Sequence, residues 1–259
     1  MSERLRYSTL KLMAESPRAY HMRQEMRGSH LRTGSAVHAM VWGTPAVALY
    51  DGRRAGREWE AFRDLHEAAG SIVVNRAEYD ASIAISDAIA SDPVVAERRL
   101  LSADGLVVEQ RIDWVFMGRP FQSTPDAACP DFITDLKTTR SAKPAFFQRD
   151  IMRYSYHVQA AIYRQAVTAA YGYTPRDCYI IAAESKPPHH VVVYRLSEAM
   201  LSIGERTACL WMEQLAQCEA AGVWPGYAQH VVDVDPPDWI DDMDDDTDTE
   251  TTDEDDTHE

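Results

Sequence analysis

The order in which helical and strand-like patterns follow each other constrains this fold more than any other feature of the sequence. In the first hundred residues, apolar side chains recur three and four positions apart, which predicts helices without an intervening strand. After Gly105 apolar and polar side chains alternate, which is typical of β-strands. The helices expected in the first part cover residues 9–23 with Ser8 as N-cap, 33 or 34 to 42, 56–69 and 77–90.

The second part of the sequence is expected to contribute a sheet and two long helices. A tight turn is predicted at 118–120 and a hairpin loop at 129–131, because Gly, Pro and Asp interrupt the alternating pattern there. The expected elements are strands 106–116, 121–127 and 131–138, helix 154–171, strands 178–185 and 191–196, and a helix from a Ser197 cap to about 221. This order predicts an α/β fold in which helices flank a central mixed sheet, with a helical N-terminal part.

The charge of the sequence is distributed unevenly. The formal net charge is −15, but residues 233–259 hold 15 acidic residues and no Lys or Arg, so residues 1–232 are neutral overall. The acidic segment has few apolar side chains to offset the entropy of ordering, which predicts a disordered tail. We expect one domain at 1–232, mainly helical over 1–100, with the sheet and helices of the candidate site over 105–221. The net charge therefore does not exclude a nucleic-acid partner.

The sequence indicates neither a membrane-spanning segment nor a metal centre bound by cysteines. No apolar run approaches the roughly 18 residues of a membrane span, and the first residues lack the apolar stretch of a signal peptide. We expect a cytoplasmic protein without a membrane partner. The four cysteines form no CxxC pair, which favours buried free thiols over a metal or iron–sulfur centre.

Two acidic residues and a lysine form the most informative pattern. Asp135 and Lys137 are two positions apart in an expected strand, so they share one face while Leu136 points into the core. A hairpin would bring Asp126, nine residues earlier, beside Asp135. Adjacent carboxylates repel unless a cation lies between them, and such oxygen ligands suit Mg²⁺ or Mn²⁺. The set suits metal-assisted phosphodiester hydrolysis, with the lysine orienting or helping to deprotonate the attacking water.

Other residues strengthen this interpretation, although each has an ordinary alternative. Asp-x-Lys on a strand is also typical of a solvated ion pair. Glu109 is either a third carboxylate of the site or an ordinary surface residue. Gln159 and Tyr163 share one face of a helix, which either looks onto the edge of the sheet or only takes part in ordinary core and surface packing. His38 is either a site residue or a hydrogen-bonded core histidine.

Taken together, these motifs resemble those of a known nuclease superfamily. The order Gly34-x3-His38, Glu109, Pro125-Asp126, Asp135-Leu136-Lys137, Gln159-x3-Tyr163 is similar to that of the PD-(D/E)XK nucleases and their RecB-like branch, which have a restriction-endonuclease-like core. Further motifs resemble the RecE type, the exonuclease VIII proteins of phages and prophages, over residues of about 6 to 227. They are Tyr7-Ser8-Thr9-Leu10-Lys11, Ala14-x-Ser16-Pro17-x2-Tyr20, Gly34-Ser35-Ala36-Val37-His38, Asp135-Leu136-Lys137-Thr138-Thr139 and Tyr154-x-Tyr156-His157-Val158-Gln159.

This resemblance implies an activity and a set of partners. It implies a Mg²⁺-dependent 5′-to-3′ exonuclease on linear double-stranded DNA, with Mn²⁺ expected to substitute and with two ions per site. The product would be a 3′ single strand for a RecT-like annealing protein in recombination. A homo-oligomeric ring, a trimer or tetramer threaded by DNA, is also implied, in the cytoplasm of a bacterial host.

The resemblance also implies roles for individual residues. Asp126, Asp135 and the Leu136 carbonyl would bind metal, and His38 would contribute to the metal site. Lys137 would contact the nucleophilic water, with Gln159 and Tyr163 orienting the lysine or the phosphate and Glu109 as a further catalytic carboxylate.

One departure from the RecE pattern concerns the first aspartate. An Arg-Pro-Asp sequence often stands before the metal strand in that family, whereas this chain has Pro125-Asp126 there and Arg119-Pro120 earlier. If Arg119-Pro120 were the true match, the aspartate would be missing. Asp126 is preferred because it has both the proline and the hairpin spacing, and Asp113 is the remaining alternative.

Two locally basic segments are the expected DNA contacts. Residues 1–32 hold seven bases against three acids, and residues 137–164 hold six bases against one acid. Phosphate contacts supply most of the sequence-independent affinity for DNA. We expect Arg32 and Arg140 to hold a terminal 5′ phosphate, and Lys143 and Arg153 to contact DNA.

Alternative functions remain open at the level of sequence. They are a RecB-like nuclease of different polarity or single-strand specificity, and a catalytically dead DNA-binding accessory protein for recombination. The acidic tail is interpreted as a solubilising segment, a docking segment for a basic partner surface, or a mimic of DNA.

Overall fold

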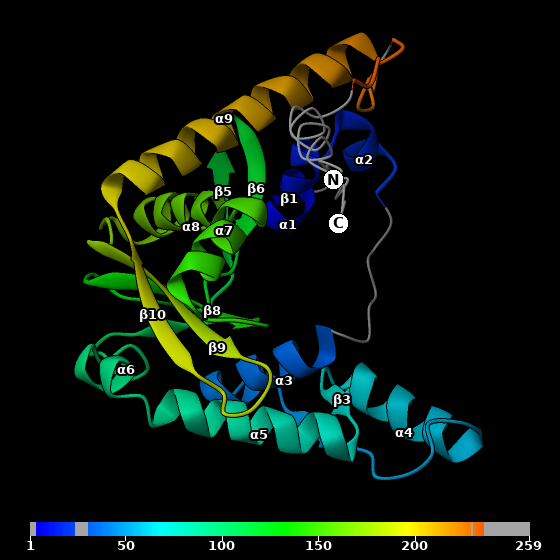
Figure 1. The fold of residues 1–259 in the computed structure, drawn as a ribbon, viewed down its shortest axis with the longest axis vertical. Coiled ribbons are helices and arrows are strands. Elements are labelled where there is room, and N and C mark those ends of the chain that lie inside the picture. Colours follow the sequence, from blue (N-terminus) through cyan, green and yellow to red (C-terminus); the bar gives the residue numbers. More distant parts are fainter. Residues whose placement is uncertain (1–3, 24–30, 229, 236–259) are drawn as a thin grey trace, which may run out of the picture.

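The computed structural model of the 259-residue chain describes residues 4–23, 31–228 and 230–235 (Figure 1). Residues 236–259 of the acidic tail and residues 24–30 of the N-terminal basic segment lie outside the described residues. The elements in chain order are β1 (Leu5–Arg6), α1 (Tyr7–Leu10), η1 (Lys11–Ala14), α2 (Pro17–His21), α3 (Leu31–Trp42), β2 (Val47–Leu49), α4 (Arg57–Ala68), β3 (Ile72–Val74), α5 (Arg76–Ala90), α6 (Pro93–Glu97), β4 (Val107–Val108), β5 (Ile112–Phe116), β6 (Arg119–Ser123), β7 (Ala127–Ala128), β8 (Phe132–Thr139), α7 (Pro144–Arg153), α8 (Tyr156–Tyr171), β9 (Asp177–Glu184), β10 (Val191–Leu196) and α9 (Glu198–Ala221).

A five-stranded mixed sheet forms the centre of the molecule, as the sequence predicts. Its strand order is β10-β9-β8-β7-β4, with β8 and β9 parallel and the other neighbours antiparallel. The expected hairpin joins β7 to β8, pairing Ala127 with Thr134 and Ala128 with Ile133. This register places Asp126, just before β7, opposite Asp135.

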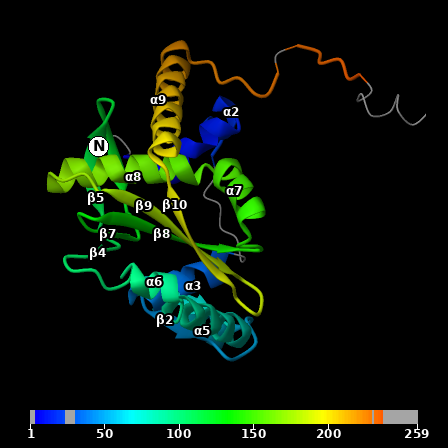
Figure 2. The same ribbon diagram turned by 60° about the vertical axis from the view of Figure 1, so that its left-hand side comes forward.

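Helices cover both faces of this sheet. Alternate residues of β8 and β9 point to opposite faces: Ile133 and Ile180 pack in the cluster with Phe147 of α7, and Leu136 and Ile181 pack in the cluster with α3 and α5. Figure 2 shows the order of the layers, with α8 between the sheet and α9, and with α3, α5 and α6 on the other side.

A smaller sheet of order β1-β6-β5 packs beside α8. Its Phe116 and Phe121 share a core with Val158 and Ile162 of α8 and with Trp211 of α9. This third cluster fixes the N-terminal strand β1 and helix α1 against α8. Residues of β1 and α1 are thereby brought near Lys137 of β8.

The expectation of an N-terminal part without strands is wrong. β2 and β3 form a parallel two-stranded sheet, and β1 pairs with β6. These strands have two or three residues, which is too short for an alternating pattern, and their partners are distant in the sequence. The helix expected over 9–23 is also divided, because Pro17 begins a new helix whose N-cap is Ser16, with Ala19 N donating to Ser16 Oγ at 3.0 Å. Arg6, not Ser8, precedes the first helix.

Two expected long strands are each divided between the two sheets. The strand expected over 106–116 becomes β4 and β5, because Glu109 adopts a positive φ of 48° between them. The strand expected over 121–127 becomes β6 and β7, since Pro125 has no N–H for a ladder. The turn expected at 118–120 lies instead at Met117 and Gly118, both with positive φ as in a two-residue hairpin.

The helices α6 and α7 were not expected from the sequence pattern. α7 ends directly before α8, and Ser155, with a φ of 57°, separates the two. All four cysteines are free, and three of them are buried. Among the described helices, none is long and apolar enough to cross a membrane.

Candidate active site

The carboxylates of Asp126 and Asp135 lie side by side at the β7–β8 hairpin. Both are buried, with 8% and 6% of the residue exposed. Asp126 Oδ2 accepts a hydrogen bond of 2.6 Å from the backbone N–H of Leu136, so the strand itself orients this carboxylate. Leu136 is fully buried in the core, as predicted.

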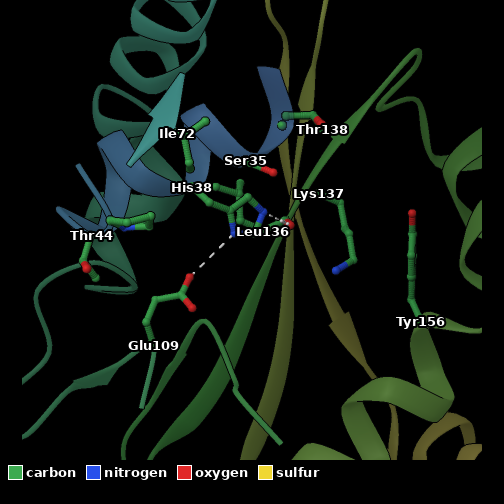
Figure 3. A pocket seen from close by; sticks show the side chains of 11 residues that line it. Ser35, His38, Thr44, Ile72, Glu109, Leu136, Lys137, Thr138 and Tyr156 are labelled. Atoms are coloured by element: carbon green, nitrogen blue, oxygen red, sulfur yellow. Dashed lines mark hydrogen bonds and ion pairs between the residues drawn. The ribbon is translucent and has the colours of Figure 1, made fainter. Parts of the chain in front are cut away.

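Asp126 joins His38 and Glu109 in a cluster of metal-ligating side chains. The potential ligand atoms of these three residues all lie within 4.8 Å of one another. His38 Nδ1 is 3.4 Å from Asp126 Oδ2. The same nitrogen is 4.0 Å from Glu109 Oε1 (Figure 3). His38 Nε2 is 2.8 Å from the carbonyl oxygen of Leu136, so its ring bridges the cluster and β8.

Backbone features position the outer members of this cluster. The left-handed turn at Glu109 ends β4, and Glu109 N donates to Asp126 O at 2.9 Å. Gly34 lets α3 approach β8 closely, since a Cβ there would lie 3.1 Å from Thr138 Oγ1. That approach brings His38, one turn further along α3, to the end of the hairpin.

The residues present fit a divalent cation. Asp135 Oδ1 is buried and has no hydrogen-bond partner among the described residues. A negatively charged oxygen is therefore left without a donor or a cation. The carboxylates of Asp126 and Glu109 and the imidazole of His38 add the oxygen and nitrogen donors that such ions take.

Excess negative charge characterises this buried site. Burial and the neighbouring charge of Asp135 raise the pKa of Asp126 to about 7. Burial alone would lower the pKa of His38, but Asp126 and a hydrogen bond to Glu109 raise it overall. Both shifts mean that the site favours the binding of positive charge, either protons or a metal ion.

Lys137 extends from the same face of β8 as Asp135. Its Nζ contacts Asp135 Oδ2 and lies 5.0 Å from the centre of the Tyr156 ring. Burial opposes its charge, but Asp135 and Asp126 raise the pKa of Lys137 overall. Lys137 is therefore held as a protonated ammonium group and acts as a donor of hydrogen bonds.

Gln159 and Tyr163 lie on the face of α8 that is turned toward Lys137. Gln159 Nε2 donates to the Tyr163 hydroxyl at 3.0 Å. Burial and the negative charge of Asp135 raise the pKa of Tyr163. The Tyr163 hydroxyl is therefore close enough to Asp135 to be affected by its charge. Gln159 and Tyr163 also line a cavity together with Lys137.

Two cavities meet at Lys137 and Tyr156, which line both of them. The first, here named the metal-side cavity, has a volume of about 560 Å³ and includes Ser35, His38 and Glu109. Figure 3 shows the Glu109 carboxylate directed toward His38, with Lys137 and Tyr156 on the opposite side of Leu136. The second, here named the N-terminal cavity, has a volume of about 360 Å³ and includes residues of β1, α1 and α8.

The structure places the four expected DNA contacts outside these cavities. Arg32 lies at the start of α3, and its charge lowers the pKa of Glu78 on α5. Arg140, Lys143 and Arg153 are exposed around β8 and α7, with the Arg153 guanidinium 5.4 Å from the centre of the Tyr154 ring. Neither cavity includes any of the four in its lining.

The alternative positions for the first aspartate lie on the smaller sheet. Asp113 pairs with Arg111 at 3.1 Å and with Arg4 at 3.7 Å. Arg119 binds Glu219 of α9. The geometry therefore brings together Asp126 and Asp135, and it directs Asp113 and Arg119 to other partners.

Sequence reasoning did not assign three residues beside the site individually, although Arg6 and Lys11 belong to the basic segment expected to contact DNA. Tyr156 stacks over Lys137, and Arg6 and Lys11 line the N-terminal cavity. The available signals were the scarcity of lysine, with four in the chain, and the position of Lys11 in a motif that resembles the RecE type. Their convergence depends on how β1 and α1 pack, which the local pattern does not specify.

Comparison with solved structures agrees with this fold. A crystal structure from Eubacterium rectale, of a protein that has been suggested to be an exonuclease, has a TM-score of 0.63 at 14% identity, covering 92% of each chain. An alkaline exonuclease from Laribacter hongkongensis matches with a TM-score of 0.29 at 13% identity, over 74% of this chain and 94% of that one. The second likeness is too weak to carry an argument, and the first shows the fold.

Comparison of the sequence with functionally curated proteins finds no match. Residues 7–234 match a family described as a PDDEXK-like domain of unknown function (DUF3799). The match includes the hairpin and both helices that flank the central sheet at the site. Because it spans most of the sequence, the chain belongs to this family of PDDEXK-like domains.

Proposed function

We propose that this protein is a Mg²⁺-dependent exonuclease that degrades linear double-stranded DNA from 5′ to 3′. The observation that carries the proposal is the buried pair Asp126 and Asp135 beside a protonated Lys137, at the end of a PDDEXK-like hairpin. The resemblance of the motifs to RecE-type enzymes supports the polarity, the duplex substrate and the exonucleolytic mode.

The metal site is proposed to consist of Asp126, Asp135, the Leu136 carbonyl and His38. Glu109 is added because it lies within the same cluster. One or two divalent ions held by these residues would stabilise developing negative charge and would make a water molecule more acidic. Mn²⁺ is expected to substitute, since it takes the same oxygen-rich donors.

The protein side chains then position the substrate and its nucleophile. The ammonium of Lys137 donates a hydrogen bond to the attacking water or to a phosphate oxygen, because Asp135 and Asp126 raise the pKa of Lys137 against the effect of burial and so favour its charged form. Tyr156 holds this ammonium from one side through its ring. Gln159 and Tyr163 present an amide and a hydroxyl that orient the phosphate.

The biological context is proposed from the same resemblance. The 3′ single strand left by the enzyme would pass to a RecT-like annealing protein in recombination, and a trimeric or tetrameric ring would keep the enzyme on its DNA. Arg32, Arg140, Lys143 and Arg153 remain proposed contacts to the duplex outside the two cavities.

Two substrates test this proposal: a linear duplex labelled at a defined end and a covalently closed circular duplex. With Mg²⁺, we expect loss of linear DNA only, with the 5′-terminal label released first and the opposite strand left single-stranded. Nicking of closed circles, or release from the 3′ end, contradicts the exonuclease of this polarity. Those outcomes favour a RecB-like nuclease of another specificity, and DNA binding without cleavage favours an accessory protein.

A further inference from the structure

The N-terminal cavity adjoins the proposed catalytic lysine, yet its lining includes none of the four residues predicted individually to contact DNA, which are Arg32, Arg140, Lys143 and Arg153. It is formed by β1 and α1, the end of β6, and α8, and it shares Lys137 and Tyr156 with the metal-side cavity. A group bound in the N-terminal cavity would therefore lie directly beside a group bound at the proposed metal site.

The lining of this cavity is cationic and rich in hydrogen-bond donors. Arg6, Lys11 and Lys137 contribute positive charge, and no carboxylate is among the described residues that line it. The hydroxyls of Ser8 and Thr124 add neutral donors. This combination is the one by which proteins hold phosphate groups.

No ion pair joins Lys11 or Arg6 to another described residue, although the charge of Glu15 acts on Lys11, whereas Lys137 already contacts Asp135. Lys11 Nζ lies 5.9 Å from the centre of the Tyr7 ring, and Arg6 Nη2 donates to Gln122 Oε1 at 3.3 Å. Partial burial and repulsion by Lys137 lower the pKa of Lys11. An anion in the cavity would relieve this repulsion.

The position of Lys11, the first residue of η1, is fixed by the packing of helix α1 directly before it. The Tyr7 hydroxyl is 3.0 Å from the Tyr154 carbonyl oxygen and 2.8 Å from that of Ser155, at the junction of α7 and α8. Tyr7 and Leu10 are buried on one face of α1. Ser8 and Lys11 remain at the solvent-accessible side of the cavity.

We propose that the N-terminal cavity binds a second phosphate of the strand being cleaved, next to the scissile phosphate, through Lys11 and Arg6. This inference rests on the proposed function and adds a site to it. The bound chemistry is a DNA phosphate, either an internal diester or a terminal 5′ monoester. Lys11 and Arg6 act as positioning residues, because they hold the strand while Lys137 and the metal site face the reacting bond.

The test compares Lys11→Ala with Lys186→Ala, which removes an exposed lysine from the β9–β10 turn. On linear duplex, Lys11→Ala is expected to raise KM about tenfold or more, as for the loss of one charge-assisted hydrogen bond. The slope of log KM against log salt should fall by about one. Lys11→Arg should restore most of the affinity, and Lys186→Ala should match the wild type.

Two substrates separate the possible sources of the phosphate. A penalty of equal size on 5′-phosphorylated and 5′-hydroxyl duplexes indicates an internal diester, and a penalty only on the phosphorylated duplex indicates a terminal monoester. A KM for Lys11→Ala within twofold of Lys186→Ala on both substrates, with an unchanged salt slope, overturns the inference.

Failure of the proposed function would be visible separately. If the wild type does not degrade DNA, fluorescence anisotropy of a labelled duplex with Ca²⁺ in place of Mg²⁺ still tests the cavity. Weaker binding by Lys11→Ala than by Lys186→Ala would then support the phosphate site, and equal binding would contradict it.

Discussion

The Asp126 carboxylate is tied to the backbone N–H of Leu136 by a hydrogen bond of 2.6 Å. This contact spans the β7–β8 hairpin and sets one carboxylate against the next, because Leu136 follows Asp135 directly. Hydrogen bonding to a backbone donor normally lowers a carboxyl pKa, yet burial and Asp135 outweigh it and raise the pKa of Asp126 to about 7. The hairpin thus holds two carboxylates in an arrangement that a cation would stabilise.

Asp126→Asn tests whether a cation supplies that stabilisation. The amide keeps an oxygen that can accept from Leu136 N but removes one negative charge. We expect Mg²⁺ or Mn²⁺ to raise the Tm of the wild type and to leave the Tm of Asp126→Asn nearly unchanged, because ligand binding stabilises the folded state only where the site exists. Thermal unfolding with and without EDTA measures the difference, and an equal metal-induced shift in both proteins would refute the assignment.

Lys137→Ala removes the ammonium that contacts Asp135. We expect activity to fall by about 100-fold or more, because a preorganised donor is lost from the reacting centre. The stability of the fold should also fall by about 1–3 kcal/mol, since buried Asp135 loses a charged partner. Activity is compared with that of Lys186→Ala at a temperature where circular dichroism shows both variants folded, and retained activity would remove Lys137 from the mechanism.

Gly204→Ala tests the packing that supports α8 from behind. A Cβ at this position of α9 would lie 2.3 Å from the carbonyl oxygen of His157, so the two helices would have to move apart. We expect a loss of about 1–3 kcal/mol in the free energy of unfolding, measured by urea denaturation. Ser202→Ala, at an exposed position of the same helix, is the control and should change stability by less than about 0.5 kcal/mol.

Glu78→Gln tests the N-terminus of α5, on which α3 packs. Burial opposes ionisation of Glu78, but hydrogen bonds from Arg54 and from the Asn75 N–H lower its pKa below the usual value of 4.5. A lowered pKa in the folded state means that Glu78 stabilises the protein above that value, and that the contribution is lost as the pH falls through the folded pKa.

The expected loss for Glu78→Gln at pH 7 is about 1 kcal/mol in the free energy of unfolding, the usual size of a capping interaction. The difference from wild type should shrink as the pH falls below about 4.5 and through the folded pKa. Urea denaturation across this pH range measures it, and a difference independent of pH would show that the carboxylate charge is not involved.

The hairpin and its charged residues were predictable because their geometry is local. Strand alternation alone puts Asp135 and Lys137 on one face, and the short loop after Ala128 fixes Asp126 opposite Asp135. The two-residue and three-residue strands β1, β2 and β3 were not predictable, since they depend on pairing with distant segments.

The same distinction applies to the site. Arg6 and Lys11 line one cavity with Lys137 because β1 pairs with β6 and the Tyr7 hydroxyl bonds to the junction of α7 and α8. Arg32 is close to His38 in the sequence, but it lies at the start of α3, where its charge acts on Glu78 of α5. Closeness in the sequence therefore does not show which part of the protein a helical side chain faces. That depends on how the helix packs against the rest of the structure.

Cleavage of linear duplex DNA by the wild type and by Asp126→Asn shows whether the carboxylates of the β7–β8 hairpin form a metal-dependent nuclease site. We expect release of acid-soluble nucleotides by the wild type with Mg²⁺, no release with EDTA, and a loss of about 100-fold or more in Asp126→Asn. Equal release by the two proteins, or release that EDTA does not prevent, would contradict this assignment.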